Sequence, residues 1–171
     1  MPNVDFPRGA VPIRYKDGRS LSVEYFDVSP TNAAIGLGDI VERRADGFVH
    51  IGVAGSQQVV GIAAQAVAAN TGGVIAVVPP QGLVFQMQSN DATINAQTDI
   101  GLNYDFVVAA PINGLSQMEI NGATQAVTAT LPILVERVSQ IITPEGNALG
   151  ANVLLDCVFN QIAYQGGGTG I

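Results

Sequence analysis

The side chains that most often perform acid–base and nucleophilic chemistry are scarce in this 171-residue sequence. His50 is the single histidine and Cys157 the single cysteine. A serine nucleophile needs a neighbouring base, and the stretch GLSQM at 114–118 has Met118 where the turn that carries such a serine needs a glycine. A Cys157–His50 pair would require an inward-facing cysteine to meet a histidine that we expect on an outer face. The sequence therefore predicts no catalytic residues.

The glycines of residues 38–63 raise the question of a phosphate-binding loop. Such loops place closely spaced glycines before a helix, and nucleoside-triphosphate sites add a lysine directly after a glycine. The single lysine, Lys16, does not follow a glycine. The spacing that begins at Gly36 and Gly38 has Val41 where the third glycine belongs. We therefore expect a turn or bulge at these glycines and no cofactor-binding residues.

Metal binding and sugar hydrolysis have weak support. One histidine and one cysteine offer little toward the four ligands of a zinc site. The stretch SNDATINAQTD at 89–99 lacks the glycine of a helix-loop-helix calcium loop, although an adventitious ion between Asp91 and Asp99 stays open. We predict no metal ligands. Sugar hydrolysis needs only two carboxyl groups about 5–10 Å apart, so with 14 acidic residues it stays an alternative.

Charge is sparse and unevenly placed. Charged residues form 12% of the chain, against a typical ~25%. Residues 1–44 hold six basic and six acidic residues, whereas residues 45–171 hold eight acidic residues and a single basic one, Arg137. An acidic body repels phosphates, so we expect no direct nucleic-acid binding. The neutral polar composition, with 11 Asn and 12 Gln, favours a subunit of an assembly.

Residues 1–35 are predicted to form an extended arm. Prolines at positions 2, 7, 12 and 30 fix the backbone and remove hydrogen-bond donors, and only SLSVEYFDV alternates, which indicates one or two short strands. Four of the ten aromatic residues lie in this segment: Phe6, Tyr15, Tyr25 and Phe26. An arm cannot bury them alone. They pack either on this subunit or on a neighbour, and we favour a neighbour on which the arm orders.

A small antiparallel β-subdomain is predicted over residues 36–80. A three-residue loop, Ala45-Asp46-Gly47, joins the two strands of residues 39–53, with Gly47 in the left-handed conformation. This register puts four apolar residues inside: Val41, Val49, Ile51 and Val53. It puts four other residues outside: Glu42, Arg44, Phe48 and His50. Of these, Glu42 and His50 are cross-strand neighbours and are expected to form a surface ion pair. Residues 59–69 and 74–78 form further strands, which Pro79-Pro80 ends.

Arg43 and Arg44, just before the turn, have two interpretations. They form either a solvated edge that discourages stray strand pairing or a contact to an acidic partner surface.

A second β-unit, sandwich-like or barrel-like, is predicted over residues 81–171, so the fold class is mostly β with few short helices. LVFQMQ alternates with Leu83, Phe85 and Met87 inward, and NVLLDCVFN places Cys157 in the core with Val153, Leu155 and Phe159. QTDIGLNYDFVV indicates a turn before a strand, and ILVERV a further strand. Asn113-Gly114 and Asn121-Gly122 mark hairpin turns. The unit ends in the glycine-rich tail YQGGGTGI.

The apolar runs and the first residues bear on location. The runs at 59–69 and 74–78 fall short of the ~18 apolar residues of a membrane-spanning helix. MPNVDFPRGAVP has prolines and an acid where a secretory signal needs a basic start and an apolar run. We expect cytoplasmic synthesis without export, and no membrane partner.

The chain resembles the capsid decoration (cement) proteins of tailed bacteriophages. The resemblance lies in the arm, in GDIVERRADGFVHIGVAGSQQVVGIA, and in the second unit from LVFQMQSNDATINAQTDIGLNYDFV to NALGANVLLDCVFNQ. It covers most of the chain. It implies a non-enzymatic virion protein, a homotrimer on the outer capsid surface, whose arm lies on the major capsid protein and which stabilises the shell against internal DNA pressure. The family offers no catalytic motif to match.

On this hypothesis the capsid-binding residues lie in the arm: Phe6, Arg8, Arg14, Tyr15 and Arg19. The hypothesis implies no small-molecule substrate and no cofactor. Two alternatives stay open, namely a structural subunit of a phage tail or fibre base, and a small hydrolase of cell-wall sugars.

Overall fold

The computed structural model describes residues 3–140 and 146–163. These residues form an all-β structure with one 3₁₀-helix, η1 (Gln97–Asp99), and no α-helix, which confirms the mostly-β prediction. The tail YQGGGTGI lies outside the described residues. The strands in chain order are β1 (Val11–Tyr15), β2 (Glu24–Val28), β3 (Ile40–Arg43), β4 (Val49–Ile51), β5 (Val59–Ala63), β6 (Gly73–Val78), β7 (Leu83–Gln88), β8 (Asn103–Val107), β9 (Glu119–Ala126), β10 (Ile133–Val138) and β11 (Leu154–Phe159).

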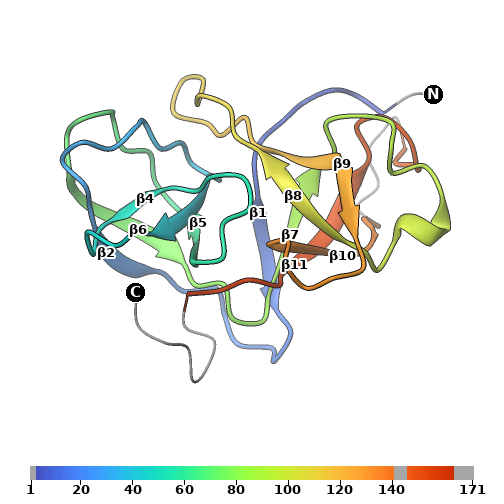
Figure 1. Ribbon diagram of the computed structural model, residues 1–171, viewed down its shortest axis with the longest axis horizontal. Coiled ribbons are helices and arrows are strands. Elements are labelled where there is room, and N and C mark those ends of the chain that lie inside the picture. Colours follow the sequence, from blue (N-terminus) through green and yellow to red (C-terminus); the bar gives the residue numbers. More distant parts are fainter. Residues whose placement is uncertain (1–2, 141–145, 164–171) are drawn as a thin grey trace.

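The strands form two units that lie side by side (Figure 1). The first is a closed barrel in the order β2-β4-β3-β5-β6, in which β2 and β4 are parallel and the other neighbours antiparallel. The second is an antiparallel six-stranded sheet in the order β1-β7-β11-β10-β8-β9. Just after β7, Ser89 pairs with Ile120 of β9, and the Asn90 amide donates to the Ile120 carbonyl at 3.0 Å. The six-stranded sheet therefore curls until β9 approaches the end of β7.

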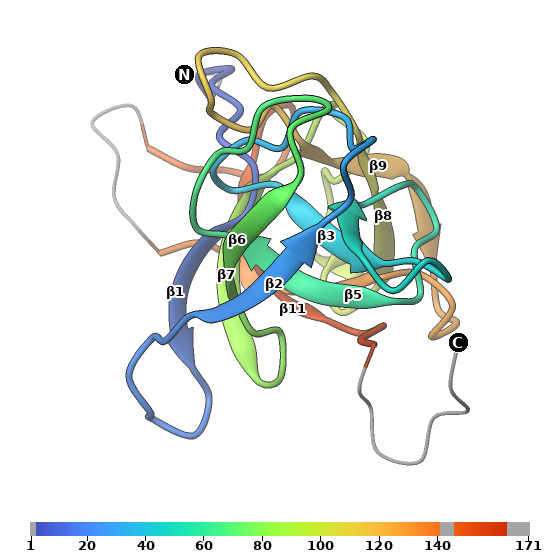
Figure 2. The ribbon, with the colours of Figure 1, turned by 90° about the vertical axis from the view of Figure 1, so that its left-hand side faces the viewer.

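The N-terminal segment contributes one strand to each unit (Figure 2). β1 pairs with β7 at the edge of the six-stranded sheet, and β2 pairs along its whole length with β6 of the barrel. Of the four aromatic residues in the predicted arm, Tyr15 is only 1% exposed and Phe26 packs partly on the barrel core. Phe6 and Tyr25 are exposed. Residues 3–10, which precede β1, are the part of the segment that resembles an arm.

The β3–β4 hairpin has the predicted register. Glu42 pairs with His50, the Arg44 amide donates to the Phe48 carbonyl at 3.2 Å, and Gly47 has a φ of 84°. This confirms the Ala45-Asp46-Gly47 loop. Val41 and Val49 lie in the barrel core as predicted, and Ile51 is partly buried against it.

Two side-chain placements in this hairpin are corrected. Val53, predicted inside, is 44% exposed because β4 ends at Ile51. Glu42 and His50, predicted outside, are both buried. The Val53 amide, in the chain that follows β4, and the Arg44 guanidinium both donate to the Glu42 carboxylate, at 3.3 and 2.8 Å.

Although His50 lies opposite Glu42 in the strand register, its side chain pairs with Asp46. Its Nε2 lies 2.8 Å from Asp46 Oδ2, and this hydrogen bond lowers the pKa of the Asp46 carboxyl below its ordinary value. Arg43, the other arginine before the turn, lies over the Phe26 ring at 5.6 Å from its centroid.

The two predicted Asn-Gly turns have different outcomes. Asn113 and Gly114 both have positive φ, and Ile112 pairs with Leu115 across them, which confirms the hairpin turn. Asn121-Gly122, predicted as a turn, lies inside β9, so that prediction is wrong. The glycine serves close packing instead, because a Cβ at residue 122 would overlap the Asp91 carboxylate.

The hydrophobic core is continuous across the two units. A large cluster joins Leu83, Phe85 and Met87 of β7 to barrel residues such as Ile40 and Ile62. A smaller cluster fills the barrel. The inward placement predicted for these three residues of β7 is confirmed, and the residues between them are buried as well. Val153, just before β11, and Leu155 and Cys157 within it are fully buried. Phe159 stacks on Phe85 with ring centroids 4.5 Å apart. Burial raises the pKa of the Cys157 thiol well above its ordinary value.

Gly61 in β5 allows the barrel strands to approach each other. Its φ is +148°, and an added Cβ would overlap the Val78 carbonyl oxygen. We expect Gly61→Ala to lower the free energy of unfolding by about 2–4 kcal/mol, from overpacking and backbone strain together. Urea unfolding should measure this. Gly47→Ala is the control, since residue 47 has open space around it; its left-handed backbone alone should cost about 1 kcal/mol. Equal losses would contradict the role of close packing at Gly61.

Candidate partner-binding groove

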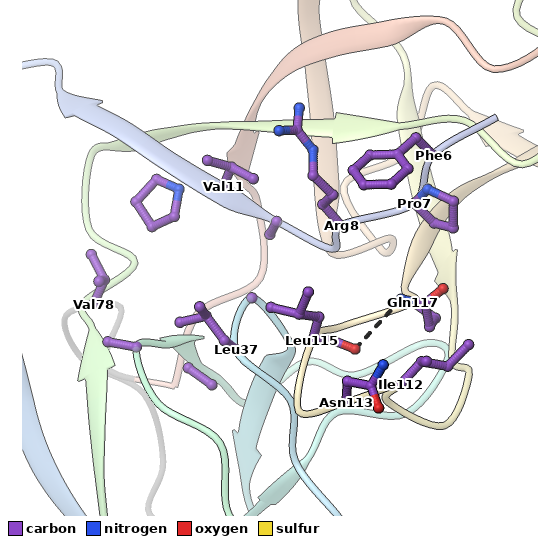
Figure 3. A pocket seen from close by; sticks show the side chains of 15 residues that line it. Phe6, Pro7, Arg8, Val11, Leu37, Val78, Ile112, Asn113, Leu115 and Gln117 are labelled. Carbon is purple, nitrogen blue, oxygen red and sulfur yellow. Dashed lines mark hydrogen bonds between the residues drawn. The ribbon is translucent and has the colours of Figure 1, made fainter. Parts of the chain in front are cut away.

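A largely apolar groove lies where the two units meet (Figure 3). Its volume is about 560 Å³. One wall is the N-terminal segment from Phe6 to Pro12, and the opposite wall comprises Leu37 and residues 112–117. The barrel contributes small apolar residues, Ala63 and Ala64. We call this feature the junction groove; its size and apolar lining are typical of a binding site.

The junction groove gathers exposed apolar side chains from distant parts of the sequence. Val4, two residues before Phe6, is also exposed. Scattered exposed apolar residues need no explanation, but a contiguous group around a concavity is typical of an interaction site. The exposed apolar residues that line the groove are Phe6, Val11, Leu37, Ile112 and Leu115.

The backbone of the first wall is held by two amide side chains. Gln88 accepts from the Phe6 amide at 3.0 Å and donates to the Val4 carbonyl at 2.7 Å. Asn3 donates to the Ala148 and Ala151 carbonyls, both at 2.8 Å. These bonds satisfy the backbone, yet the Phe6 side chain remains 62% exposed. The protein thus fixes this segment while it leaves the apolar side chain to the solvent.

The opposite wall is a tight hairpin. The Ile112 and Leu115 amides each donate to the other's carbonyl at 2.9 Å across the Asn113-Gly114 turn. Leu37 is bonded to this hairpin on both sides, to the Gly114 carbonyl at 2.8 Å and from the Ser116 amide at 3.0 Å. Leu37, Ile112 and Leu115 are therefore positioned by backbone hydrogen bonds.

The two walls meet closely at the buried residue Ser116. A Cβ at Gly9, whose φ is +67°, would overlap the Ser116 hydroxyl, so glycine is needed there. Next to it Asp39 is fully buried, and its Oδ2 accepts from the Gly36 amide at 2.6 Å. Burial raises the pKa of the Asp39 carboxyl, against the lowering effect of the Ser116 hydroxyl and the Gly36 amide.

Two arginines beside the groove have no carboxylate partner among the residues that the structure describes. Arg8 lines the groove, with its guanidinium 5.6 Å from the centroid of the Phe6 ring. Arg14 is exposed in β1. Val11 pairs with Gln86 of β7, and Arg14 pairs with Val84. Because Gln86 and Val84 are two residues apart in β7, Val11 and Arg14 face the same side of the sheet. Both arginines are thus available to a partner.

The five residues predicted to bind a capsid have three different placements. Phe6 and Arg8 lie at the groove, and Arg14 lies further along β1. Arg19 is held by the protein itself: it stacks over the Tyr15 ring at 3.9 Å and donates to the Gln81 carbonyl at 2.6 Å. The prediction that Tyr15 contacts a partner is corrected, because β1 directs this side chain into the core.

The Tyr15 hydroxyl donates to the Pro79 carbonyl at 3.1 Å, and burial raises the pKa of its phenol. Its ring therefore offers no surface to a partner. The residues that sequence reasoning missed are Leu37, Ile112 and Leu115. Their only signal was apolar side chains next to turn residues, as in PINGL.

The carboxylates considered as an ion site accept hydrogen bonds from backbone amides of their own loops. Asp91 accepts from the Thr93 amide at 2.9 Å, and Asp99 accepts from the Ala96 amide at 2.8 Å. Over residues 3–140 and 146–163, no three His, Cys, Asp or Glu side chains are grouped to hold a metal. His50 lies in the barrel and Cys157 in the six-stranded sheet, so they belong to different units.

Comparison with protein-family models, with curated proteins and with solved structures finds no match. Among the described residues no helix is long and apolar enough to cross a membrane.

Glu119 of β9 lies near the like charge of Asp5 in the N-terminal segment. Its Oε1 is buried and has no hydrogen-bond partner among the described residues. Burial, and then the charge of Asp5, raise the pKa of the Glu119 carboxyl to about 6. A carboxyl whose pKa rises on folding favours the folded state when protonated, so stability is lost as pH rises from about 4.5 through about 6.

We therefore expect Glu119→Gln to raise the melting temperature at pH 7.5 and to have little effect at pH 4, where the native side chain is also neutral. Thermal unfolding followed by circular dichroism between pH 4 and 8 measures this difference. Glu24→Gln, an exposed glutamate in β2, is the control. A gain from Glu119→Gln that does not vary with pH would contradict the interpretation.

Proposed function

We propose that this chain is a non-enzymatic virion structural protein, a capsid decoration protein that binds the outer surface of the major capsid shell. The observation that carries the proposal is Phe6. Its backbone is fixed by Gln88, and its ring stands 62% exposed at an apolar groove. An aromatic ring that stays exposed although its backbone is held in place is explained if a partner covers the ring.

The charge distribution supports a surface role of this kind. Residues 45–171 carry the whole net charge of −7, whereas residues 1–44 sum to zero. An acidic body keeps decorated particles apart from one another and from anionic surfaces. The neutral N-terminal part, with Arg8 at an apolar groove and Arg14 exposed in β1, is the face suited to contact.

A second exposed apolar group suits self-association. Tyr25 is 69% exposed in β2, and Val74 of β6 is exposed as well. Val74 pairs with Asp27, two residues from Tyr25, so both side chains lie on the outer face of the barrel. We assign this outer face of β2 and β6 to the contacts of a homotrimer. The chain then has one apolar surface for the shell and another for its own copies.

Shell binding is tested with capsids of the parent virus that lack this protein. Phe6→Ala should weaken binding at least tenfold in co-sedimentation, because burying such a side chain contributes roughly 1.5–3 kcal/mol. Deletion of residues 1–8, which leaves β1 intact, should abolish binding. Val127→Ala is the control, since Val127 is 85% exposed and does not line the groove. Normal capsid decoration by both Phe6→Ala and the deletion variant would refute the proposal. Tubes or rings formed by the isolated chain would favour a tail subunit instead.

Self-association is tested by light scattering coupled to size exclusion. Tyr25→Asp should convert trimers to monomers and leave the circular dichroism spectrum unchanged, because the side chain is exposed. Phe6→Ala should remain trimeric. Trimers that persist in Tyr25→Asp would remove the outer face of β2 and β6 from the interface.

A further inference from the structure

We propose that the junction groove takes an extended, acid-bearing apolar segment of the partner protein. This segment lies along β1, places a large apolar side chain between Phe6 and Leu115, and places carboxylates on Arg8 and Arg14. The inference rests on the groove being the shell-binding surface and adds the chemistry of what occupies it.

The position of β1 favours an extended occupant. β1 is the edge strand of the six-stranded sheet and pairs with β7 on one side only. Val11 and Pro12 of this strand line the groove. An unpaired strand edge beside apolar pockets is the arrangement by which proteins bind peptides in extended form. Pro12 and the bulge between Pro12 and Arg14 interrupt the edge, which discourages pairing with long foreign strands.

The unpaired arginines set the charge of the occupant. Within the described ranges, Lys16, Arg19, Arg44 and Arg137 each pair with a carboxylate of this chain. Arg8 and Arg14 lack such a partner there, although the chain has 14 acidic residues for seven basic ones. Two arginines without carboxylates in an acidic protein, one lining the groove and the other further along β1, complement an acidic ligand.

The spacing of these arginines sets the length of the occupant. Arg8 and Arg14 are six residues apart, which corresponds to up to ~20 Å of extended chain. A ligand that contacts both arginines and also fills the groove must be of similar length. A peptide of about six to nine residues satisfies this requirement, whereas a compact apolar molecule would fill the groove and leave both arginines unpaired.

Fluorescence anisotropy with synthetic peptides tests the inference on the full chain. The probe is a labelled nine-residue peptide in which Asp alternates with Val around a central Phe; the matched peptide has Lys in place of each Asp. We expect the acidic peptide to bind at least tenfold more tightly than the lysine peptide. We also expect its affinity to fall about tenfold between 0.05 and 0.5 M salt, because exposed charge pairs are screened.

Three variants locate the binding. Arg8→Glu with Arg14→Glu should abolish the preference for the acidic peptide, and Leu115→Asp should abolish binding of both peptides. Arg19→Glu makes the same change of charge at an arginine already paired with Asp17, and should change affinity less than twofold. Circular dichroism checks that each variant is folded. Equal affinity for the two peptides, or unchanged binding in Leu115→Asp, would overturn the inference.

The capsid experiment separates this inference from the proposed function. If Phe6→Ala loses capsid binding while neither peptide binds, the shell surface stands and the extended acidic occupant is wrong. If the acidic peptide binds as expected while Phe6→Ala decorates capsids normally, the occupant is right and the shell is not the partner. If no peptide binds and light scattering shows self-association that requires Phe6, the groove is filled by a second copy of the chain, which also overturns the inference.

Discussion

Closure of the barrel by β2 is the constraint on which the rest of the structure depends. β2 pairs along its whole length with β6, and at Val28 it meets Val49 of β4 in the only parallel pairing between the described strands. Because closure requires this strand, the preceding chain must arrive from the neighbouring sheet, whose edge is β1. The N-terminal segment is therefore shared by two units, and its first part, from Phe6 to Pro12, forms one wall of the junction groove.

The shared core explains why the groove has fixed walls. Ile40 of the barrel packs in the same cluster as Phe106 and Met118, and its amide donates to the Met118 sulfur at 3.3 Å. Below the groove, Gly9 and Gly36 bring backbones against Ser116 with no space for a Cβ. The two walls thus contact each other closely at Ser116. The separation of the apolar side chains at the rim is set by backbone packing, so loop motion has little influence on it.

Patterns with a period of two predicted the fold well, because successive side chains of a strand point to opposite faces. The β3–β4 register, the inward face of β7 and the buried Cys157 could all be derived from local sequence. Side chains whose environment depends on distant segments could not. Tyr15 is covered because β1 joins β7, and Asn121-Gly122 is extended because the loop around Asp91 packs on it. The arm indicated one wall of the groove. The second wall, at Leu37 and Leu115, is formed by residues far apart in the sequence.

The hydrogen bonds between Gln88 and residues 4–6 have a thermodynamic consequence for association. A disordered arm that folds on its partner loses conformational entropy at that moment, and such coupled folding gives a large negative heat-capacity change. Here the ordering of the segment is completed when the subunit itself folds. Docking would then resemble the closing of two rigid surfaces, with a heat-capacity change set by the apolar area of the groove alone and an association rate limited by orientation rather than by refolding.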